Sequence, residues 1–382
     1  MELEIKETIV ARRMEKRGLM NRDISFFLSA WRHMTQKRSV VDWKHIKPVT
    51  GDQVFKLPEE TSLKYNELYG LGEQEMSKCA IVKLNGGRAT TMGGTVPKCM
   101  IPVKNEKNFL DIVMGQIMAS NDRNGIEMPL ILMNSFFTDH VTEKIVGQTP
   151  LIIMNFIQNE YPRIREDNLM PLDTGTDDDW CPAGHGDFFS SLEGSGCLDG
   201  LLELGYTYAF ISNIDNLSAE VSPVILGQMV SKNHDFMMEV TKKTANDIKG
   251  GAPVRYNGNL SLLEIAEVPQ DNMADFQDIE KFQFFNTNNL WIDLKALKKL
   301  ITEQRLNLPI IQNRKNICER DIIQIETAMG AGLQCFSSPG LVEVPRNRFT
   351  PVKKMEDLVE LQSDLYTMNT NYQLQKKTAE SY

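Results

Sequence analysis

Short apolar segments alternate with longer amphipathic stretches along the chain from about residue 76 onward. The apolar segments are short and bounded by turn-forming residues, which is typical of buried strands; they are Cys79–Leu84, Pro129–Met133, Leu151–Phe156, Tyr208–Ile214 and Asp235–Val240. The amphipathic stretches between them have the pattern of surface helices; they include Asn108–Ala119, Thr138–Val146 and Pro223–Lys232. This alternation predicts an α/β fold with a mixed, mainly parallel central sheet flanked by helices.

The two ends of the chain differ from this central part. Residues 1–75 are charged and helix-favouring, and they predict a small N-terminal helical segment with a loop at Lys47–Asp52. Residues 76–366 carry the alternating pattern and are expected to form the main, Rossmann-like domain. Residues 367–382 are polar, so we expect them to form a solvated or frayed C-terminal tail.

A glycine-rich loop follows the first candidate strand. The loop contains Gly86, Gly87, Gly93 and Gly94 and leads to Lys98. Glycines allow the backbone to approach a ligand closely, and a lysine adds a compact positive charge for phosphate. In open α/β sheets ligands bind beyond the carboxyl ends of the strands, where this loop lies. The spacing fits neither the nucleoside-triphosphatase loop nor the dinucleotide fingerprint, and a solvated surface turn is the alternative.

Composition and charge narrow the class of protein. With 382 residues, 41% of them hydrophobic, and a formal charge of −9, the chain can bury a large core and lacks the basic character of a general nucleic-acid binder. No apolar run approaches the ~20 residues that a membrane span needs. The six cysteines are scattered, and the N-terminus does not read as a signal peptide. We therefore expect reduced thiols and a cytoplasmic protein without nucleic-acid or membrane partners.

Several polar residues interrupt apolar surroundings and are candidates for chemistry. Asp215 closes the Tyr208–Ile214 run, where a carboxylate suits Mg²⁺, although it could instead cap a helix. His185 lies between two glycines and could donate to a phosphate or ribose oxygen, or could be structural. Glu264 lies in a strand-like run and could accept from a hydroxyl group or face water.

Three further clusters are less specific. Lys249–Gly251 and Phe285–Asn289 offer amide and backbone groups that suit sugar hydroxyls, but glycine and asparagine also dominate ordinary turns. Lys353 follows the basic segment 346–348 and could reach a phosphate group or belong to a solvated basic loop.

Taken together, these segments resemble the eukaryotic UTP–glucose-1-phosphate uridylyltransferase (UDP-glucose pyrophosphorylase) family. The resemblance extends from about residue 41 to about residue 366 and includes Lys83–Gly87, Met133–Phe136, Tyr161–Ile164, Pro182–Asp187, Ser212–Leu217, Met238–Thr241, Lys249–Gly251, Phe285–Trp291, Gln324–Ala328 and Val344–Lys353. Many separate motifs in the same order make a chance match improbable.

The family implies a Rossmann-like nucleotidyltransferase that converts UTP and glucose 1-phosphate into UDP-glucose and pyrophosphate with Mg²⁺. By matching motif, the nucleotide-binding residues would be Leu84, Asn85, Gly86, Gly87, Gln158 and Gly184. The residues that bind the sugar phosphate would be His185, Asn213, Gly251, Glu264, Asn286 and Asn288. Lys98 and Lys353 would neutralise the phosphates as catalytic residues, and Asp215 would help to hold Mg²⁺.

The chain departs from the family pattern in its loop and in its length. Arg88, Ala89 and Val96 stand where the family usually has leucine, glycine and glycine. The family usually continues into a C-terminal β-helix that carries oligomer contacts, so we expect a monomer or a loose dimer here. Two alternatives are a pyrophosphorylase for another UDP-sugar and a non-catalytic protein that binds UTP or a UDP-sugar.

Overall fold

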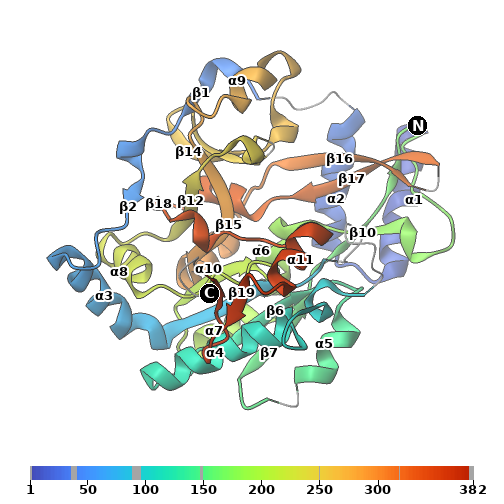
Figure 1. Cartoon of the computed structure of the whole chain (residues 1–382). Coiled ribbons are helices and arrows are strands. Elements are labelled where there is room, and N and C mark those ends of the chain that lie inside the picture. The colour runs from blue at the N-terminus through green and yellow to red at the C-terminus, as the bar shows by residue number, and fades with distance from the viewer. Residues whose placement is uncertain are drawn as a thin grey trace.

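An eight-stranded sheet forms the centre of the molecule (Figure 1). The computed structural model describes residues 2–35, 41–87, 96–146, 149–248, 250–317 and 319–377. The strand order in the sheet is β2-β18-β12-β15-β11-β3-β6-β7. In that order the strands are Phe55–Lys56, Pro339–Glu343, Phe236–Lys242, Phe284–Asp293, Tyr208–Asn213, Cys79–Leu84, Leu130–Asn134 and Ile153–Ile157. Only β15 runs antiparallel to its neighbours within this described sheet, which confirms the expected mixed, mainly parallel α/β fold.

Helices cover both faces of the sheet because successive strand residues point to opposite sides. On β3, Ala80 and Val82 join one apolar core, while Cys79 and Ile81 join the other. The first core is completed by α6, α7 and α10, which are Phe188–Gly194, Cys197–Glu203 and Leu294–Thr302. The second core is completed by α4 and α8, which are Phe109–Asn124 and Pro223–Ser231. Both cores therefore hold the sheet that positions the site.

Local sequence signals explain where these helices begin. Asn108 and Asp111 form a capping box at the start of α4. Ser222 caps α8, and Pro223 occupies its first turn, where a missing N–H group costs nothing.

The N-terminal region is not purely helical, and this corrects the expectation for residues 1–75. Its helices are α1 (Glu2–Arg17), α2 (Asn21–Thr35) and α3 (Leu63–Glu75), but β1 (Ile46–Pro48) and β2 lie between them. The expected loop at 47–52 overlaps β1, which pairs with β13. Because β2 forms the edge of the central sheet, the N-terminal region contributes to the main fold. The division into domains stays a prediction.

Smaller sheets and helices surround the central sheet. Two three-stranded sheets are β1-β13-β14, with β13 at Ala252–Tyr256 and β14 at Asn259–Leu263, and β16-β17-β9, at Ile310–Ile317, Arg320–Thr327 and Ile164–Arg165. Two-stranded pairs are β10 with β8, at Trp180–Pro182 and Glu160–Pro162, and β4 with β5, at Pro102–Lys104 and Lys107–Asn108. The remaining α-helices of the described residues are α5 (Asp139–Val146), α9 (Met273–Gln277) and α11 (Met355–Gln362).

The C-terminal segment is folded, so the expectation of a solvated or frayed tail is wrong for residues up to 377. β19 (Tyr366–Met368) and β20 (Leu374–Lys376) form a hairpin. The Tyr372 ring packs against α4 so closely that a Cβ added at Gly115 would lie 2.4 Å from it. Gln373 donates to both carboxylate oxygens of Glu220. A few apolar and amide side chains therefore attach the hairpin to α4 and to Glu220, although most residues of this segment are polar.

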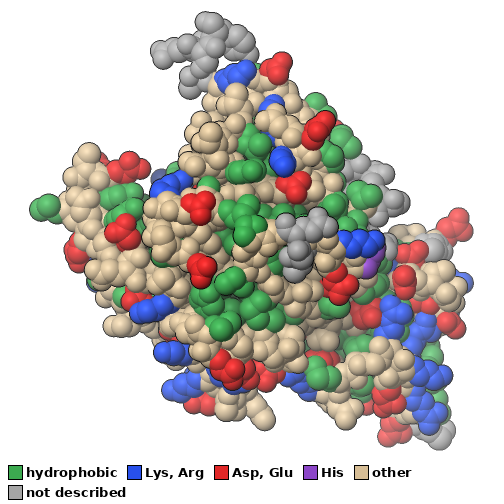
Figure 2. Space-filling view, turned by 90° about the horizontal axis from the view of Figure 1, so that it is seen from below, with side chains coloured by type: hydrophobic (Ala, Val, Ile, Leu, Met, Phe, Trp, Pro, Cys, Tyr) green, Lys and Arg blue, Asp and Glu red, His purple; other side chains and the backbone are tan. Residues whose placement is uncertain are grey.

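The surface mixes charges of both signs. On the face shown in Figure 2, Lys and Arg side chains are interspersed with Asp and Glu side chains around an apolar area. The whole sequence has 51 acidic and 42 basic residues. In the part of the chain that the structure describes, we find no helix of the length and apolar character that crossing a membrane requires.

Candidate active site

A cavity of about 320 Å³ opens at the carboxyl ends of β3 and β11. It gathers residues from six separate segments of the chain: Leu84, Gly86, Gly87, Lys98, Met133, Gln158, Pro182, Gly184, His185, Asn213, Ile214 and Asp215. Parallel strands place their carboxyl ends at one edge, so residues that are distant in sequence meet there. Most of the nucleotide-side residues proposed from the sequence share this one cavity.

The glycine loop forms one wall of the cavity. A Cβ added at Gly86 would lie 2.0 Å from the amide nitrogen of Gln158, so the glycine allows Gln158 to reach the cavity. The backbone N–H group of Lys98 donates to the Gly87 carbonyl oxygen at 3.1 Å. This bond holds Lys98, which follows the loop, close to Gly87, which precedes it. Arg88 and Ala89 lie outside the described residues. Val96 is 49% exposed, so its side chain meets solvent.

Asn85 is not among the residues that line the cavity. Its side chain is only 1% exposed and donates to the Asn134 oxygen at 2.8 Å. Asn134 in turn donates to Asp139 and Thr142. This network ties the end of β3 to the end of β6 and to α5, and the nucleotide-binding role of Asn85 stays a prediction.

Lys98 and Asp215 form an ion pair at the cavity. The Lys98 ammonium nitrogen and the Asp215 Oδ2 atom are 2.5 Å apart, and the side chains are 13% and 12% exposed. Among the described residues, the buried Oδ1 atom of Asp215 finds no hydrogen-bond partner. No α-helix starts within the next six residues, so Asp215 is not the helix cap that the alternative interpretation required. The pair presents a cation for phosphate and a spare carboxylate oxygen for a metal ion.

The His185 ring is held in one tautomer. Gly184 has φ +88°, and a Cβ there would lie 2.7 Å from the Thr327 carbonyl oxygen, so only glycine fits. The Met329 N–H group donates to Nδ1 of His185 at 3.0 Å. Burial lowers the pKa of His185 to about 4, which keeps the ring neutral at pH 7. The ring proton therefore resides on Nε2, which can donate to a substrate oxygen.

A buried carboxyl group supports the segment that carries Gln158. Asp187 accepts from the backbone and side-chain nitrogens of Asn159, at 2.6 and 3.0 Å, and from the Ser191 hydroxyl. Burial raises the pKa of Asp187 to about 6. The Gln158 N–H group donates to the Asn134 carbonyl oxygen at 2.9 Å. These bonds fix the position of Gln158 on the cavity wall.

Hydrogen bonds between asparagine residues connect the cavity to a second cluster, which consists of Gly251, Glu264, Asn286 and Asn288. Asn288 donates through its side chain to Asn213 and through its backbone to the Asn286 side chain, both at 2.9 Å. The Asn286 N–H group donates to the Gly251 carbonyl oxygen at 3.0 Å. The buried Oδ1 atom of Asn288 finds no partner in the described part of the chain. This oxygen can accept from a ligand hydroxyl group.

Glu264 completes the second cluster. It directly follows β14 rather than lying inside a strand, and a Cβ added at Gly251 would lie 2.7 Å from its Oε1 atom. Burial, with a smaller contribution from Glu267, raises the pKa of Glu264 to about 7. Gly251, Glu264, Asn286 and Asn288 thus lie together, but none of them lines the 320 Å³ cavity itself.

Lys353 lines a neighbouring cavity of about 610 Å³, together with Gly250, Phe285 and Arg346. Its ammonium nitrogen lies 5.8 Å from the centre of the Phe349 ring. The preceding residue, Val352, donates its N–H group to the Asp215 carbonyl oxygen at 3.2 Å. The C-terminal segment is therefore attached to the loop that carries Asp215. Lys249 and Cys318 lie outside the described residues, and the other five cysteines are free thiols, as expected.

Sequence reasoning missed the residues that hold this edge of the sheet together. Lys83 and Glu239 are buried charges at 2% and 0% exposure, inside strands. A charged residue within an apolar strand run was the available signal for both. Met133, Pro182 and Ile214 provide apolar contacts in the cavity and carry no comparable signal.

The fold and the cavity define a nucleotide-binding α/β protein with the charged groups that a phosphate-transferring enzyme needs. The family model described as UTP–glucose-1-phosphate uridylyltransferase matches residues 24–382. The chain belongs to this family.

Individual relatives agree with this assignment. UTP–glucose-1-phosphate uridylyltransferase 2 of Dictyostelium discoideum is 43% identical over 348 residues, which cover 88% of this chain and 68% of that protein. The barley (Hordeum vulgare) UTP–glucose-1-phosphate uridylyltransferase is 41% identical over 359 residues, covering 92% and 75%.

Solved structures show the same fold. The crystal structure of a UDP-glucose phosphorylase from Trypanosoma brucei has a TM-score of 0.87 and 34% identity, covering 97% of this chain and 82% of that chain. A mutant UDP-glucose pyrophosphorylase from Leishmania major, solved in complex with UDP-glucose, has a TM-score of 0.84 and 31% identity with the same coverage.

Proposed function

We propose that this chain transfers the uridylyl group of UTP to glucose 1-phosphate, giving UDP-glucose and pyrophosphate. One observation carries the proposal: the glycine loop, Gln158, His185 and the Lys98–Asp215 pair converge on a single cavity at the strand ends. Family membership supplies the identity of the substrates, and the cavity supplies groups that suit them.

The reaction is a direct displacement at the α-phosphorus of UTP. A phosphate oxygen of glucose 1-phosphate forms the new P–O bond while the bond to pyrophosphate breaks, so no covalent enzyme intermediate is required. Catalysis of this kind depends on positioning and on offsetting developing negative charge. In the proposal, Lys98 contacts the triphosphate and the Nε2–H group of His185 donates to a phosphate oxygen. Gln158 and Gly184 bind the uracil.

A divalent cation fits beside Asp215. Mg²⁺ commonly binds through one or two carboxylates and fills its remaining positions with water and substrate phosphates. Asp215 has a buried oxygen without a partner in the described chain, and the described residues hold no cluster of three or more acidic, histidine or cysteine ligands. This donor set suits a cation that arrives with the nucleotide, and Mg²⁺ would supply charge neutralisation at the phosphates.

The second cluster is proposed to bind the glucosyl group. The Oδ1 atom of Asn288, which has no partner among the described residues, and the partly buried carboxyl group of Glu264 offer acceptors for sugar hydroxyls, and Gly251 leaves room beside Glu264. Lys353 reaches the phosphates if the C-terminal segment, which is bonded to the Asp215 loop, moves toward the cavity.

The test is a coupled assay of pyrophosphate release from UTP and glucose 1-phosphate, with and without Mg²⁺. We expect turnover only with both substrates and the metal ion. Higher kcat/KM with galactose 1-phosphate or N-acetylglucosamine 1-phosphate would instead identify a pyrophosphorylase for another UDP-sugar. UTP binding without turnover would identify a non-catalytic binding protein. The cytoplasmic location and the monomeric or loosely dimeric state stay predictions.

A further inference from the structure

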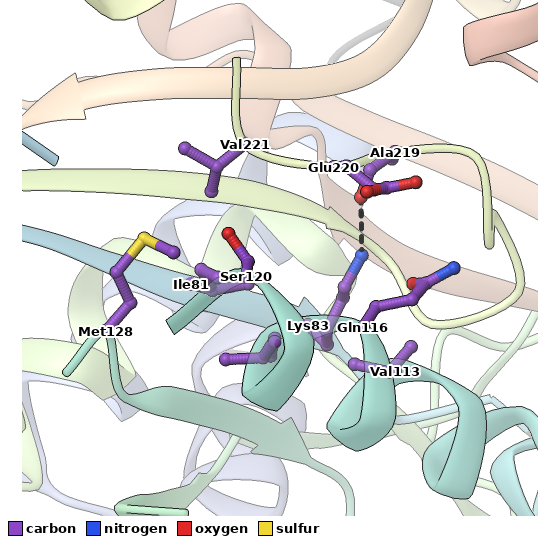
Figure 3. Close-up of a pocket in the computed structure, with 10 residues that line it drawn as sticks. Ile81, Lys83, Val113, Gln116, Ser120, Met128, Ala219, Glu220 and Val221 are labelled. Atoms are coloured by element: carbon purple, nitrogen blue, oxygen red, sulfur yellow. Dashed lines mark hydrogen bonds between the residues drawn. The ribbon is translucent and has the colours of Figure 1, made fainter. Parts of the chain in front are cut away.

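A buried lysine of the central sheet donates hydrogen bonds to both ends of the segment that runs from the end of β11 into the loop that leads to α8. Lys83, the penultimate residue of β3, is 2% exposed. Its ammonium group donates to the Ser212 hydroxyl at 2.7 Å and to the Ala219 carbonyl oxygen at 3.0 Å. Figure 3 shows the lysine reaching up from the strand to the loop at Ala219 and Glu220.

These two acceptors bracket the part of the loop that faces the cavity. Ser212 lies in β11 and Ala219 lies seven positions further on. The residues between them include Asn213 and Asp215, both of which line the 320 Å³ cavity. One ammonium group thus connects the two ends of the segment that presents Asp215.

Other bonds hold the middle and the far end of the same loop. Gln116 on α4 donates to the Leu217 carbonyl oxygen at 2.9 Å. Arg348 donates to the Glu220 carbonyl oxygen at 2.9 Å, and Asn216 accepts from the Thr350 N–H group at 3.1 Å. The loop is therefore tied to α4 and to the C-terminal segment, while Lys83 ties it to the central sheet.

Packing alone does not favour a lysine at this position. The surrounding cavity of about 30 Å³ is lined partly by apolar residues such as Ile81, Val113 and Met128. Both acceptors are neutral oxygens, and burying an ammonium group without a paired carboxylate is costly. A methionine of similar length would fill the space without this cost. The hydrogen bonds to the loop, rather than packing, therefore account for a lysine at this position.

The electrostatic surroundings keep the amine charged at neutral pH. Burial lowers the pKa of Lys83 to about 8, while Glu220, Asp215 and Glu239 oppose this shift and Arg348 adds to it. The ammonium form therefore predominates at pH 7, with its donors directed at the loop.

We infer that Lys83 is a positioning residue that holds the Asp215 loop in the conformation required for binding the metal ion. This inference rests on the proposed function. Lys83 does not line the substrate cavity, so it acts through the loop.

The test compares Lys83→Met with Ile81→Val. Ile81 lies two residues earlier on the same face of β3 and lines the same small cavity, but it is apolar and offers the loop no hydrogen bond. The first measurement is amide hydrogen exchange in the ligand-free protein at residues 214, 216 and 219, whose N–H groups are hydrogen-bonded within or beside the loop. We expect exchange at these amides to be about tenfold faster in Lys83→Met and unchanged in Ile81→Val.

The second measurement is steady-state kinetics. We expect kcat of Lys83→Met to fall by about 10- to 100-fold and the half-saturating Mg²⁺ concentration to rise about tenfold. KM for UTP should stay within about threefold of the wild type, because Gln158 and Gly184 lie on other elements. A role in packing alone would lower Tm without changing the Mg²⁺ requirement.

Ser212→Ala removes one acceptor and keeps the lysine, so it tests the same contact if Lys83→Met fails to fold. We expect faster loop exchange and a higher Mg²⁺ requirement in this variant too, by about two- to fivefold for one lost hydrogen bond. The inference is overturned if Lys83→Met folds and shows wild-type amide exchange and wild-type Mg²⁺ dependence. If Lys83→Met does not fold, the same result for Ser212→Ala overturns it. It is also overturned if Ile81→Val shows the changes expected for Lys83→Met. A wild-type protein without turnover, but with the expected exchange differences, would refute the proposed function and leave loop positioning standing.

Discussion

The ammonium nitrogen of Lys98 lies 2.5 Å from the carboxylate of Asp215, although the two residues are 117 positions apart in the chain. One comes from the segment after the glycine loop and the other from the loop after β11. The two side chains are only 13% and 12% exposed, so their opposite charges attract each other more strongly than those of a fully exposed pair do. In the proposed reaction, Lys98 would exchange this partner for a phosphate group of UTP, and Asp215 would exchange Lys98 for a metal ion.

Removing the cation should reduce turnover strongly. We expect Lys98→Ala to lower kcat by about 100- to 1000-fold, the usual loss for a preorganised group that offsets transition-state charge. The control is Lys107→Ala, an exposed lysine in β5 that makes the same change in net charge. Near-wild-type turnover of a folded Lys98→Ala protein, measured by pyrophosphate release, would exclude Lys98 from catalysis.

The contact between the glycine loop and Gln158 should control nucleotide affinity. In Gly86→Ala the new methyl group would lie 2.0 Å from the Gln158 amide nitrogen, so that side chain must leave the cavity wall. We expect KM for UTP to rise about tenfold, the value of one lost hydrogen bond, with little change in Tm. Gly70→Ala in α3, where the added methyl group meets open space, is the matched control. Equal KM values for UTP in both variants would contradict the assignment of Gln158.

The partly buried imidazole of His185 should make stability depend on pH. The pKa of His185 is about 4 in the folded protein and about 6.5 when unfolded. Between these values the unfolded chain binds more protons, so the free energy of unfolding falls as the pH drops from about 6.5 to 4. This single group accounts for up to about 3 kcal/mol of that loss.

His185→Asn provides the comparison, because the asparagine oxygen can still accept from the Met329 N–H group. Chemical denaturation of both proteins at several pH values between 4 and 7 gives the difference. Between pH 7 and pH 4 we expect the free energy of unfolding to fall less in the variant than in the wild type, by up to about 3 kcal/mol. Parallel curves for the two proteins would show that His185 titrates normally.

The buried pair of Arg348 and Glu239 should matter far more for stability than surface pairs do. Glu239 is fully buried and accepts from Arg348, Asn289 and Trp291. Arg348→Met leaves this carboxylate without its cation, which should lower the free energy of unfolding by about 3–5 kcal/mol. Lys376→Met, which breaks an exposed pair with Glu360, should lower it far less, because solvent screens that pair. Urea denaturation measures both, and similar losses would disprove the special role of the buried pair.

The sequence alone determined the alternation of strands and helices, the glycine loop after β3 and the acidic residue after β11. These features are encoded locally: apolar spacing reports burial, and glycines mark places where the backbone must come close to another group. The family motifs added which residues to expect near the nucleotide.

Only the tertiary structure decided which of these residues share a cavity. The sheet order places β3 beside β11 and brings Lys98 to Asp215, whereas the chain positions of the two give no hint of the contact. The tertiary structure also shows that Asn85 is hydrogen-bonded to Asn134 and that Lys353 lines a neighbouring cavity. The C-terminal hairpin packs against α4. Local patterns record how each residue meets its immediate surroundings. Contacts between distant segments depend on strand pairing and core packing, which are properties of the whole chain.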